Sequence, residues 1–179
     1  LQFLNFVLTY FDEGISIFFF FSSFFCLSLL PNSLQNKLVL EYSNYDSLWV
    51  LLVDNSITPV ECDEFFSWLI GARREPPDGY AAIDDDNASN LFTNRMLTLR
   101  PSAHSSLSFR CFQRYFCDRN IKKGSMKWKD HIKEDDFEVL DMNLVGYNEL
   151  WDIALDVQHP DVVNEAMEFL IKLQNKISP

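Results

Sequence analysis

The sequence has 179 residues and a formal net charge of −11, and 47% of its residues are hydrophobic. With only 5 Gly and 7 Pro, this composition excludes a chain that is disordered throughout, because enough apolar surface is present to build a core. The acidic balance also argues against a general nucleic-acid binder, which neutralises phosphates with clustered Lys and Arg.

The cysteines indicate the cellular compartment of the protein, and the chain ends indicate that it is part of a longer one. The four cysteines, Cys26, Cys62, Cys111 and Cys117, have no Cys-x2-Cys spacing, so we expect reduced thiols in an intracellular, cytoplasmic protein. The sequence begins at Leu1 rather than Met and stops directly after a predicted helix. We therefore expect a fragment of something longer.

Residues 1–42 are an apolar, low-complexity segment. The run Ile15 to Leu30 is 16 residues long and uncharged, whereas a membrane span usually needs ~20 apolar residues and a secretory signal has Lys or Arg before its apolar run. Here Asp12 and Glu13 come before the run. Three interpretations stay open: a membrane anchor through Ile15 to Leu30, a buried helix, and a tract that is not genuine coding sequence, since Phe, Ser and Leu codons are pyrimidine-rich.

Residues 43–179 are predicted to form a helical-repeat region. The apolar run within Asn44 to Asp54 fits a buried helix or a strand equally well. Next, Thr58 and Glu61 frame a capping box with proline at the first helical position, so a helix is expected from Pro59 to Arg73. A loop near residues 75–87 should follow.

Two further helices are predicted in the middle of the chain, from Ala88 to Leu99 and from His104 to Asn120. In the second, Phe109, Phe112 and Phe116 recur at i, i+3 and i+7, which is typical of an inner helix. A charged loop near residues 121–143 follows. It contains two strand-like stretches, Met126 to Trp128 and Phe137 to Leu140, that suit a hairpin.

The C-terminal residues predict two antiparallel helices, Gly146 to Asp156 and Pro160 to Ile177, joined by a short turn. Two such helices cannot enclose a core alone, so they need neighbouring helices. The predicted class is therefore all-α, an armadillo/HEAT-like helical-repeat (α-solenoid) fragment. Its expected core is Phe66, Leu69, Leu97, Phe109, Phe112, Phe116, Leu150, Trp151, Ala154, Ala166, Leu170 and Leu173. In the terminal helices, Leu155, Val163 and Ile177 are expected on the buried faces as well.

Few residues suggest chemistry. Cys111 lies seven residues after His104 and could pair with it, although a buried thiol is the simpler interpretation. The acidic run from Asp84 to Asn87 lacks the Gly and terminal Glu of a calcium loop, so it should cap the next helix. Ligand pairs for zinc are missing. We predict no catalytic, cofactor-binding or metal-binding residue and no cofactor.

Arginines at 73, 74, 95 and 100 are the remaining polar feature. They could form a small basic patch if their helices are adjacent. Pairing with nearby carboxylates, or simple solvation, is the more ordinary outcome for such side chains.

The succession from Cys62 to Pro179 resembles a known family. Its signs are CDEFFSWLIGA, LFTNRMLTLRPSAHSSLSFRCFQRYFCDRNIKKGSMK and DMNLVGYNELWDIALDVQHPDVVNEAMEFLIKLQNKISP. A Phe-rich helix (Phe109 to Phe116) precedes a polar Asn120 and a Gly-containing link, and a Gly-x-x-x-Leu-Trp helix (Gly146 to Trp151) follows. The sequence is similar in these respects to the non-catalytic helical region of the very large ubiquitin carboxyl-terminal hydrolases of the fat-facets type.

This resemblance implies an intracellular thiol-dependent deubiquitinase whose catalytic Cys and His lie in a separate domain. The expected function is a scaffold or interaction segment, with ubiquitinated substrates or the hydrolase domain of the same parent chain as partners. Two alternatives remain: a helical protein anchored to a membrane through Ile15 to Leu30, and an independent small Cys/His enzyme.

Overall fold

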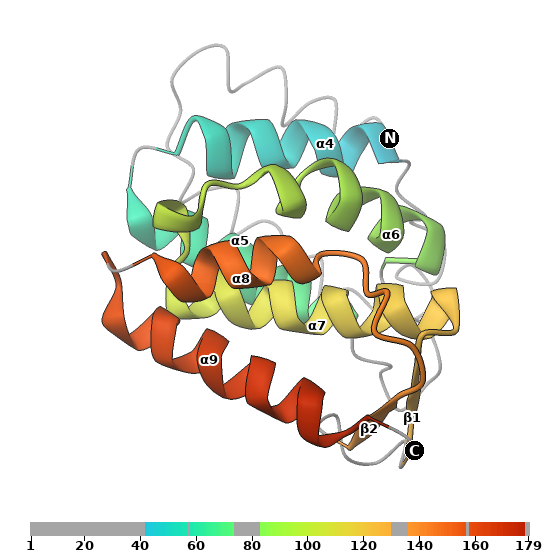
Figure 1. The fold of residues 1–179 in the computed structure, drawn as a ribbon. Helices are drawn as coiled ribbons and strands as arrows, with labels where there is room; N and C mark the ends of the chain where they lie inside the picture. Colours follow the sequence, from blue (N-terminus) through green and yellow to red (C-terminus); the bar gives the residue numbers. More distant parts are fainter. Residues whose placement is uncertain (1–41, 57, 74–82, 130–135, 157, 178–179) are drawn as a thin grey trace, which may run out of the picture. The chain divides into compact units, whose positions relative to one another are not determined.

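The computed structural model describes residues 42–56, 58–73, 83–129, 136–156 and 158–177. The described helices and strands, drawn in Figure 1, are α4 (Tyr42–Trp49), a π-helical turn (Val50–Asp54), α5 (Pro59–Ala72), α6 (Asp85–Asn94), two 3-10 turns (Met96–Thr98 and Pro101–Ala103), α7 (Ser106–Lys123), β1 (Met126–Trp128), β2 (Phe137–Val139), α8 (Tyr147–Leu155) and α9 (Pro160–Asn175). Interpretations of Ile15 to Leu30 lie outside the described residues.

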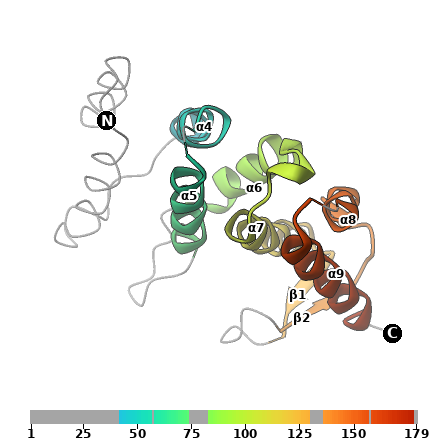
Figure 2. The same ribbon diagram turned by 90° about the vertical axis from the view of Figure 1, so that its left-hand side faces the viewer.

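The helices are arranged as successive layers. In Figure 2, α4 and α5 come first, α6 and α7 lie in the middle, and α8 and α9 follow. Helices α5 and α6 both pack on α7, and α8 packs along α9, which also contacts α7. The predicted all-α, armadillo-like class is confirmed, with α7 as the central helix.

Local sequence signals explain the ends of the N-terminal helices. The capping box predicted at Thr58 is present, because its side chain accepts from the N–H of Glu61 while the Glu61 carboxylate accepts from the N–H of Thr58. The apolar run after Asn44 is helical, which resolves the helix-or-strand ambiguity. Its Trp49 packs edge-on against Phe66 of α5, with ring centroids 5.6 Å apart.

Helices α6 and α7 differ from the predicted ranges in ways that capping explains. Helix α6 begins at Asp85 rather than Ala88, because the Asp84 carboxylate accepts from the N–H of Asn87 and starts the helix earlier. It ends at Asn94, and a 3-10 turn occupies part of the remaining predicted range. In α7 the N-cap is Ser105, so His104 lies outside the helix, which continues past Asn120 to Lys123.

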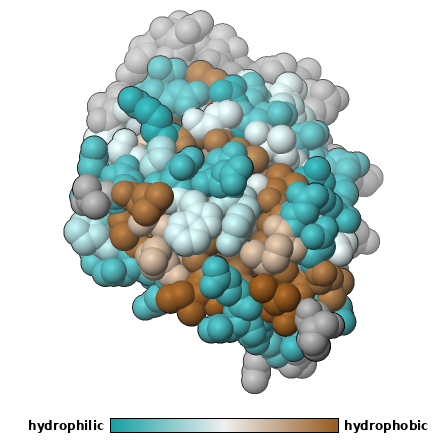
Figure 3. Space-filling view, viewed as in Figure 1, coloured by the Kyte–Doolittle hydropathy of each residue, from teal (hydrophilic) through white to brown (hydrophobic). Residues whose placement is uncertain are grey.

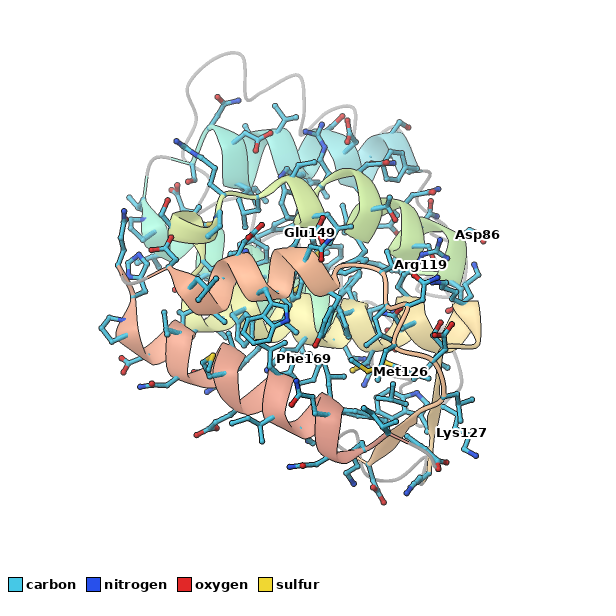
Figure 4. All side chains as sticks on the ribbon, viewed as in Figure 1. Asp86, Arg119, Met126, Lys127, Glu149 and Phe169 are labelled. Atoms are coloured by element: carbon cyan, nitrogen blue, oxygen red, sulfur yellow. The ribbon has the colours of Figure 1, made fainter. Side chains whose placement is uncertain are left out.

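The hairpin predicted inside the charged loop is confirmed. Strands β1 and β2 pair antiparallel, with Met126 opposite Val139 and Trp128 opposite Phe137. Met126, Phe137 and Val139 are buried, so one face of this small sheet closes the end of the core beside α7 and α9. Figure 4 shows Met126 and Phe169 of α9 on the part of the molecule where the hairpin meets the helices.

Most of the expected core is buried. Ten of its members are buried: Phe66, Leu69, Phe109, Phe112, Phe116, Leu150, Ala154, Ala166, Leu170 and Leu173. Leu97 and Trp151 are only half-buried, so their assignment to the core was wrong. Leu97 belongs to a 3-10 turn instead of a continuous helix, which removes it from the buried stripe of α6.

The buried faces of the last two helices are rotated relative to the prediction. In α8 the buried residues are Leu150, Ile153 and Ala154, whereas Leu155 is 69% exposed. Trp151 therefore lies at the edge of the buried face, one residue position away from its centre. In α9, Val162 and Phe169 are buried, Val163 is half-buried, and Ile177 is 47% exposed.

Candidate functional site

The Cys/His pair suggested by the sequence has no catalytic geometry. His104 is 2% exposed, and its Nδ1 lies 3.2 Å from the Ser108 hydroxyl. Burial lowers the pKa of His104 to about 4, so the imidazole is neutral at physiological pH. Cys111 is fully buried, and burial raises the pKa of its thiol well above the ordinary value. A nucleophilic thiol needs a lowered pKa and access to substrate, and Cys111 has neither.

The other described cysteines fit the same conclusion. Burial, assisted by the nearby Asp63 carboxylate, raises the pKa of Cys62 to about 11. Cys117 is buried in α7. All three described cysteines are free thiols, and their surroundings suit packing rather than reaction with a substrate.

The buried histidine makes the stability of the fold sensitive to acid. The pKa of His104 is about 4 in the folded chain, whereas its ordinary value of 6.5 applies to the unfolded chain. The unfolded chain therefore takes up the proton first as the pH falls. This stability is fully present above pH ~6.5 and is lost as the pH falls through ~4. Between pH 7 and pH 5, the wild type should lose about 2 kcal/mol more stability than His104→Gln, measured by urea unfolding. The wild type and His104→Gln share every other titrating group. Equal losses of stability in the two proteins would therefore contradict the lowered pKa of His104.

The predicted arginine patch is divided into two separate ion-pair groups. Arg73 donates from Nε to Asp118 (2.8 Å), from one terminal nitrogen to Asp85 (2.9 Å) and from the other to the carbonyl of Ile83 (2.8 Å). These contacts join the end of α5 to α6 and α7. Neighbouring carboxylates also raise the pKa of Arg73 despite its burial.

Arg95 forms the second group, with its Nε 2.6 Å from Asp46 of α4 and a terminal nitrogen 3.4 Å from Asp54. The Arg95 hydrogen bond lowers the pKa of the Asp46 carboxyl. Both arginines are therefore engaged in holding helices together. Arg74 lies outside the described residues, and Arg100 is exposed.

The acidic run has structural partners. Asp84 caps α6, Asp85 pairs with Arg73, and Asp86 pairs with Lys122 of α7. Within the described ranges, no cluster of three or more His, Cys, Asp or Glu side chains could hold a metal ion. None of the described helices is long and apolar enough to cross a membrane.

The feature best suited to binding is a surface on the last two helices. Helix α8 carries Tyr147, Trp151 and Leu155 at i, i+4 and i+8, and α9 carries Val163, Met167 and Ile171 at the same spacing. Leu155, Ile171 and Met167 are 69%, 55% and 38% exposed, respectively. We call these six residues the α8–α9 surface. Figure 3 shows brown and pale areas over these helices, interrupted by teal.

The sequence prediction missed this surface because it placed Trp151 and Leu155 inside the core. The signal that could have found it is the second i, i+4 stripe of each helix, beside the buried one. In α9, for example, the buried face contains Phe169 and Leu170, so Met167 and Ile171 must be directed elsewhere. Trp151 and Tyr147 contact each other edge-on, with ring centroids 6.4 Å apart.

Comparison with known proteins gives one family and several relatives. The family model described as "UBP24/USP9X/USP9Y ARM repeat" matches residues 26–120, more than half of the chain. This match begins at residue 26, within the N-terminal apolar segment. The resemblance described from the sequence begins further along the chain, at Cys62.

The relatives are ubiquitin carboxyl-terminal hydrolases. The mouse (Mus musculus) hydrolase 9Y is 23% identical over 145 residues, which are 81% of this chain and 5% of the relative. The mouse hydrolase 9X is 24% identical over 132 residues, 74% of this chain and 5% of the relative. A probable hydrolase named FAF from Drosophila melanogaster is 23% identical over 134 residues, covering 74% of this chain and 4% of its own length. The chain thus spans about one-twentieth of these relatives.

Proposed function

The chain belongs to the ARM-repeat family of UBP24, USP9X and USP9Y, and on this premise we propose that it is a non-catalytic scaffold or interaction segment of a ubiquitin-specific cysteine protease. The observation that carries the proposal is the family match over residues 26–120, together with relatives that are named as ubiquitin carboxyl-terminal hydrolases. The process it serves is protein deubiquitination, in the cytoplasm.

The chemistry of the described residues supports a non-catalytic role. A thiol protease needs an accessible cysteine whose pKa is lowered by a neighbouring histidine. In this chain, burial raises the pKa of Cys111 and of Cys62, and it lowers that of His104. The catalytic cysteine and histidine of the proposed parent enzyme would therefore belong to a separate domain.

Helical-repeat proteins commonly act by presenting extended surfaces to other proteins. We propose that this segment positions either a ubiquitinated substrate or the hydrolase domain of its parent chain. Its exposed apolar residues on α8 and α9 are the part of the described structure that fits such a role. A fluorescently labelled chain can be titrated with ubiquitin chains and with the isolated hydrolase domain of a fat-facets relative. Saturable binding to one of them is expected, and binding to neither would contradict the proposed partners.

The purified chain should hydrolyse no ubiquitin conjugate, because its described thiols are buried or have raised pKa values. The measurement is fluorophore release from a ubiquitin–fluorophore conjugate, with an active ubiquitin hydrolase as the positive control. Cys111→Ala is the matched variant and should leave the background rate unchanged. Turnover by the wild type that disappears in this variant would show that the chain itself is an enzyme.

A further inference from the structure

The six residues of the α8–α9 surface border one seam between the two helices. On α9, Phe169 contacts Phe137 of β2, with ring centroids 6.2 Å apart, and Lys172 lies over the same ring. These contacts place the hairpin on one flank of α9. With 100° between successive residues, Val163 and Met167 lie on the other flank, towards α8.

The corresponding stripe of α8 is directed towards α9. Figure 4 shows Glu149 on the side of α8 that is nearer to α6. Tyr147 and Trp151 are two residues before and after Glu149, which places both on roughly the opposite side of the helix. The stripes therefore run along the two sides of the same seam between α8 and α9. A third helix can pack its own ridge of side chains between two such i±4 ridges.

Acidic residues flank this apolar seam on both outer sides. Helix α8 carries Glu149 and Asp152, contains no Lys or Arg, and is followed by Asp156. Helix α9 carries Asp161 and Glu168, and also Lys172 and a Glu165 that pairs with Arg110. Apart from Glu165, none of these carboxylates forms an ion pair with another described residue. The seam is thus an apolar strip between two margins on which carboxylates outnumber Lys and Arg among the described residues.

The charges beside the seam indicate which kind of partner would bind there. A second copy of this chain would bring the same acidic margins together, and its net charge of −11 adds to the repulsion. An amphipathic helix with an aliphatic stripe and Lys or Arg on both sides would fill the seam and neutralise its margins. The exposed Leu155 and Ile171 and the half-buried Trp151 supply the apolar contacts, of the type that dominates binding energies.

We propose that the α8–α9 surface binds a basic amphipathic helix of a partner protein. This inference rests on the proposed function as an interaction segment and names the chemistry of its partner. Affinity comes from insertion of the aliphatic stripe between the two ridges, and selectivity comes from the acidic margins.

The test is fluorescence anisotropy of the full chain with two labelled helical peptides. The basic peptide has Leu at i, i+3, i+4 and i+7 with Lys on both sides of the stripe, and the acidic peptide has Glu in place of each Lys. The basic peptide is expected to bind roughly tenfold or more tightly than the acidic one, and its affinity should fall as salt is added.

Variants locate the site. Ile171→Glu should weaken binding of the basic peptide by roughly tenfold or more, because it places a charge in the apolar seam. Leu140→Glu is the matched control, since Leu140 is also exposed (47%) but follows β2, outside the seam, and should change affinity less than about twofold.

Glu168→Lys should weaken binding several-fold, whereas Asp141→Lys, also exposed, should have little effect. Circular dichroism checks that each variant keeps its helices.

Three outcomes would overturn the proposal. Equal affinity for the basic and acidic peptides would mean that the seam is a general stacking face for another helical repeat. A dimer in sedimentation equilibrium that Ile171→Glu dissociates would identify a second copy as the occupant. Absence of saturable binding would exclude the basic helix directly. None of these outcomes decides whether the chain hydrolyses ubiquitin conjugates or binds a hydrolase domain, so the proposed function is tested separately.

Discussion

Replacing Gly146 with alanine should destabilise the folded chain by about 3 kcal/mol, because the backbone conformation and the surrounding space both exclude a side chain. Gly146 precedes α8 with φ +87°, a conformation that is unfavourable for residues with a Cβ. An added Cβ would also lie 2.9 Å from Cζ of Phe92, 3.0 Å from Cδ2 of Leu97 and 3.3 Å from Cδ2 of Phe116. Urea unfolding followed by circular dichroism measures the change.

Two other glycines separate the cost of the backbone conformation from the cost of steric overlap when alanine is introduced. Gly124 has a similar φ of +83°, but a Cβ there would meet nothing within 4 Å. Gly124→Ala should therefore cost about 1 kcal/mol, the backbone contribution alone. Gly71 lies in α5, is exposed and has open space around it, so Gly71→Ala should stabilise by about 0.5–1 kcal/mol. A cost at Gly146 no greater than that at Gly124 would contradict the tight packing.

Replacing Asn120 with alanine should cost about 2–4 kcal/mol, because it removes a buried amide and leaves the N–H and C=O of the half-buried Val145 without their partner. The fully buried Asn120 side chain donates from Nδ2 to the carbonyls of Phe116 (2.9 Å) and Val145 (3.0 Å). Its Oδ1 accepts from the N–H of Val145 at 2.8 Å. The side chain thus supplies both hydrogen bonds of Val145 and fixes the segment that leads into Gly146 and α8.

Asn164 provides the control for this prediction. It lies in the second turn of α9 and is exposed, so Asn164→Ala should change the free energy of unfolding by less than about 0.5 kcal/mol. Both variants are compared by their midpoints in urea at the same pH. If Asn120→Ala unfolds at the same urea concentration as the wild type, the Asn120–Val145 contacts are unimportant for stability.

These two sites show how the α7–α8 connection is specified. The sequence places a polar Asn120 late in a Phe-rich helix and Gly146 before the next helix, and both belong to the pattern that resembles the family. Their physical roles required the structure, because Asn120 and Val145 are 25 residues apart. No local rule predicts that a buried amide will pair with a backbone segment at that distance along the chain.

The α8–α9 surface illustrates the opposite case, in which the helices were predicted correctly but their buried faces were not. The ranges of α8 and α9 were well predicted, but the buried side of a short helix depends on where its neighbours lie. Helix α8 packs on α9 and on the 3-10 turn Pro101–Ala103, so Leu150, Ile153 and Ala154 are buried. Leu155 and the edge of Trp151 are left to solvent as a consequence.

The sequence by itself determined the helical class, the capping box at Thr58, the hairpin of Met126 to Trp128 with the strand beginning at Phe137, and the central role of the Phe-rich helix. Each depends on periodicity or on contacts between residues close along the chain. Only the tertiary structure decided that His104 and Cys111 are buried without catalytic geometry, that Arg73 and Arg95 bind different carboxylates, and that Trp151 borders an exposed seam. Burial and pairing depend on which helices lie side by side, and that arrangement comes from contacts between residues far apart in the sequence.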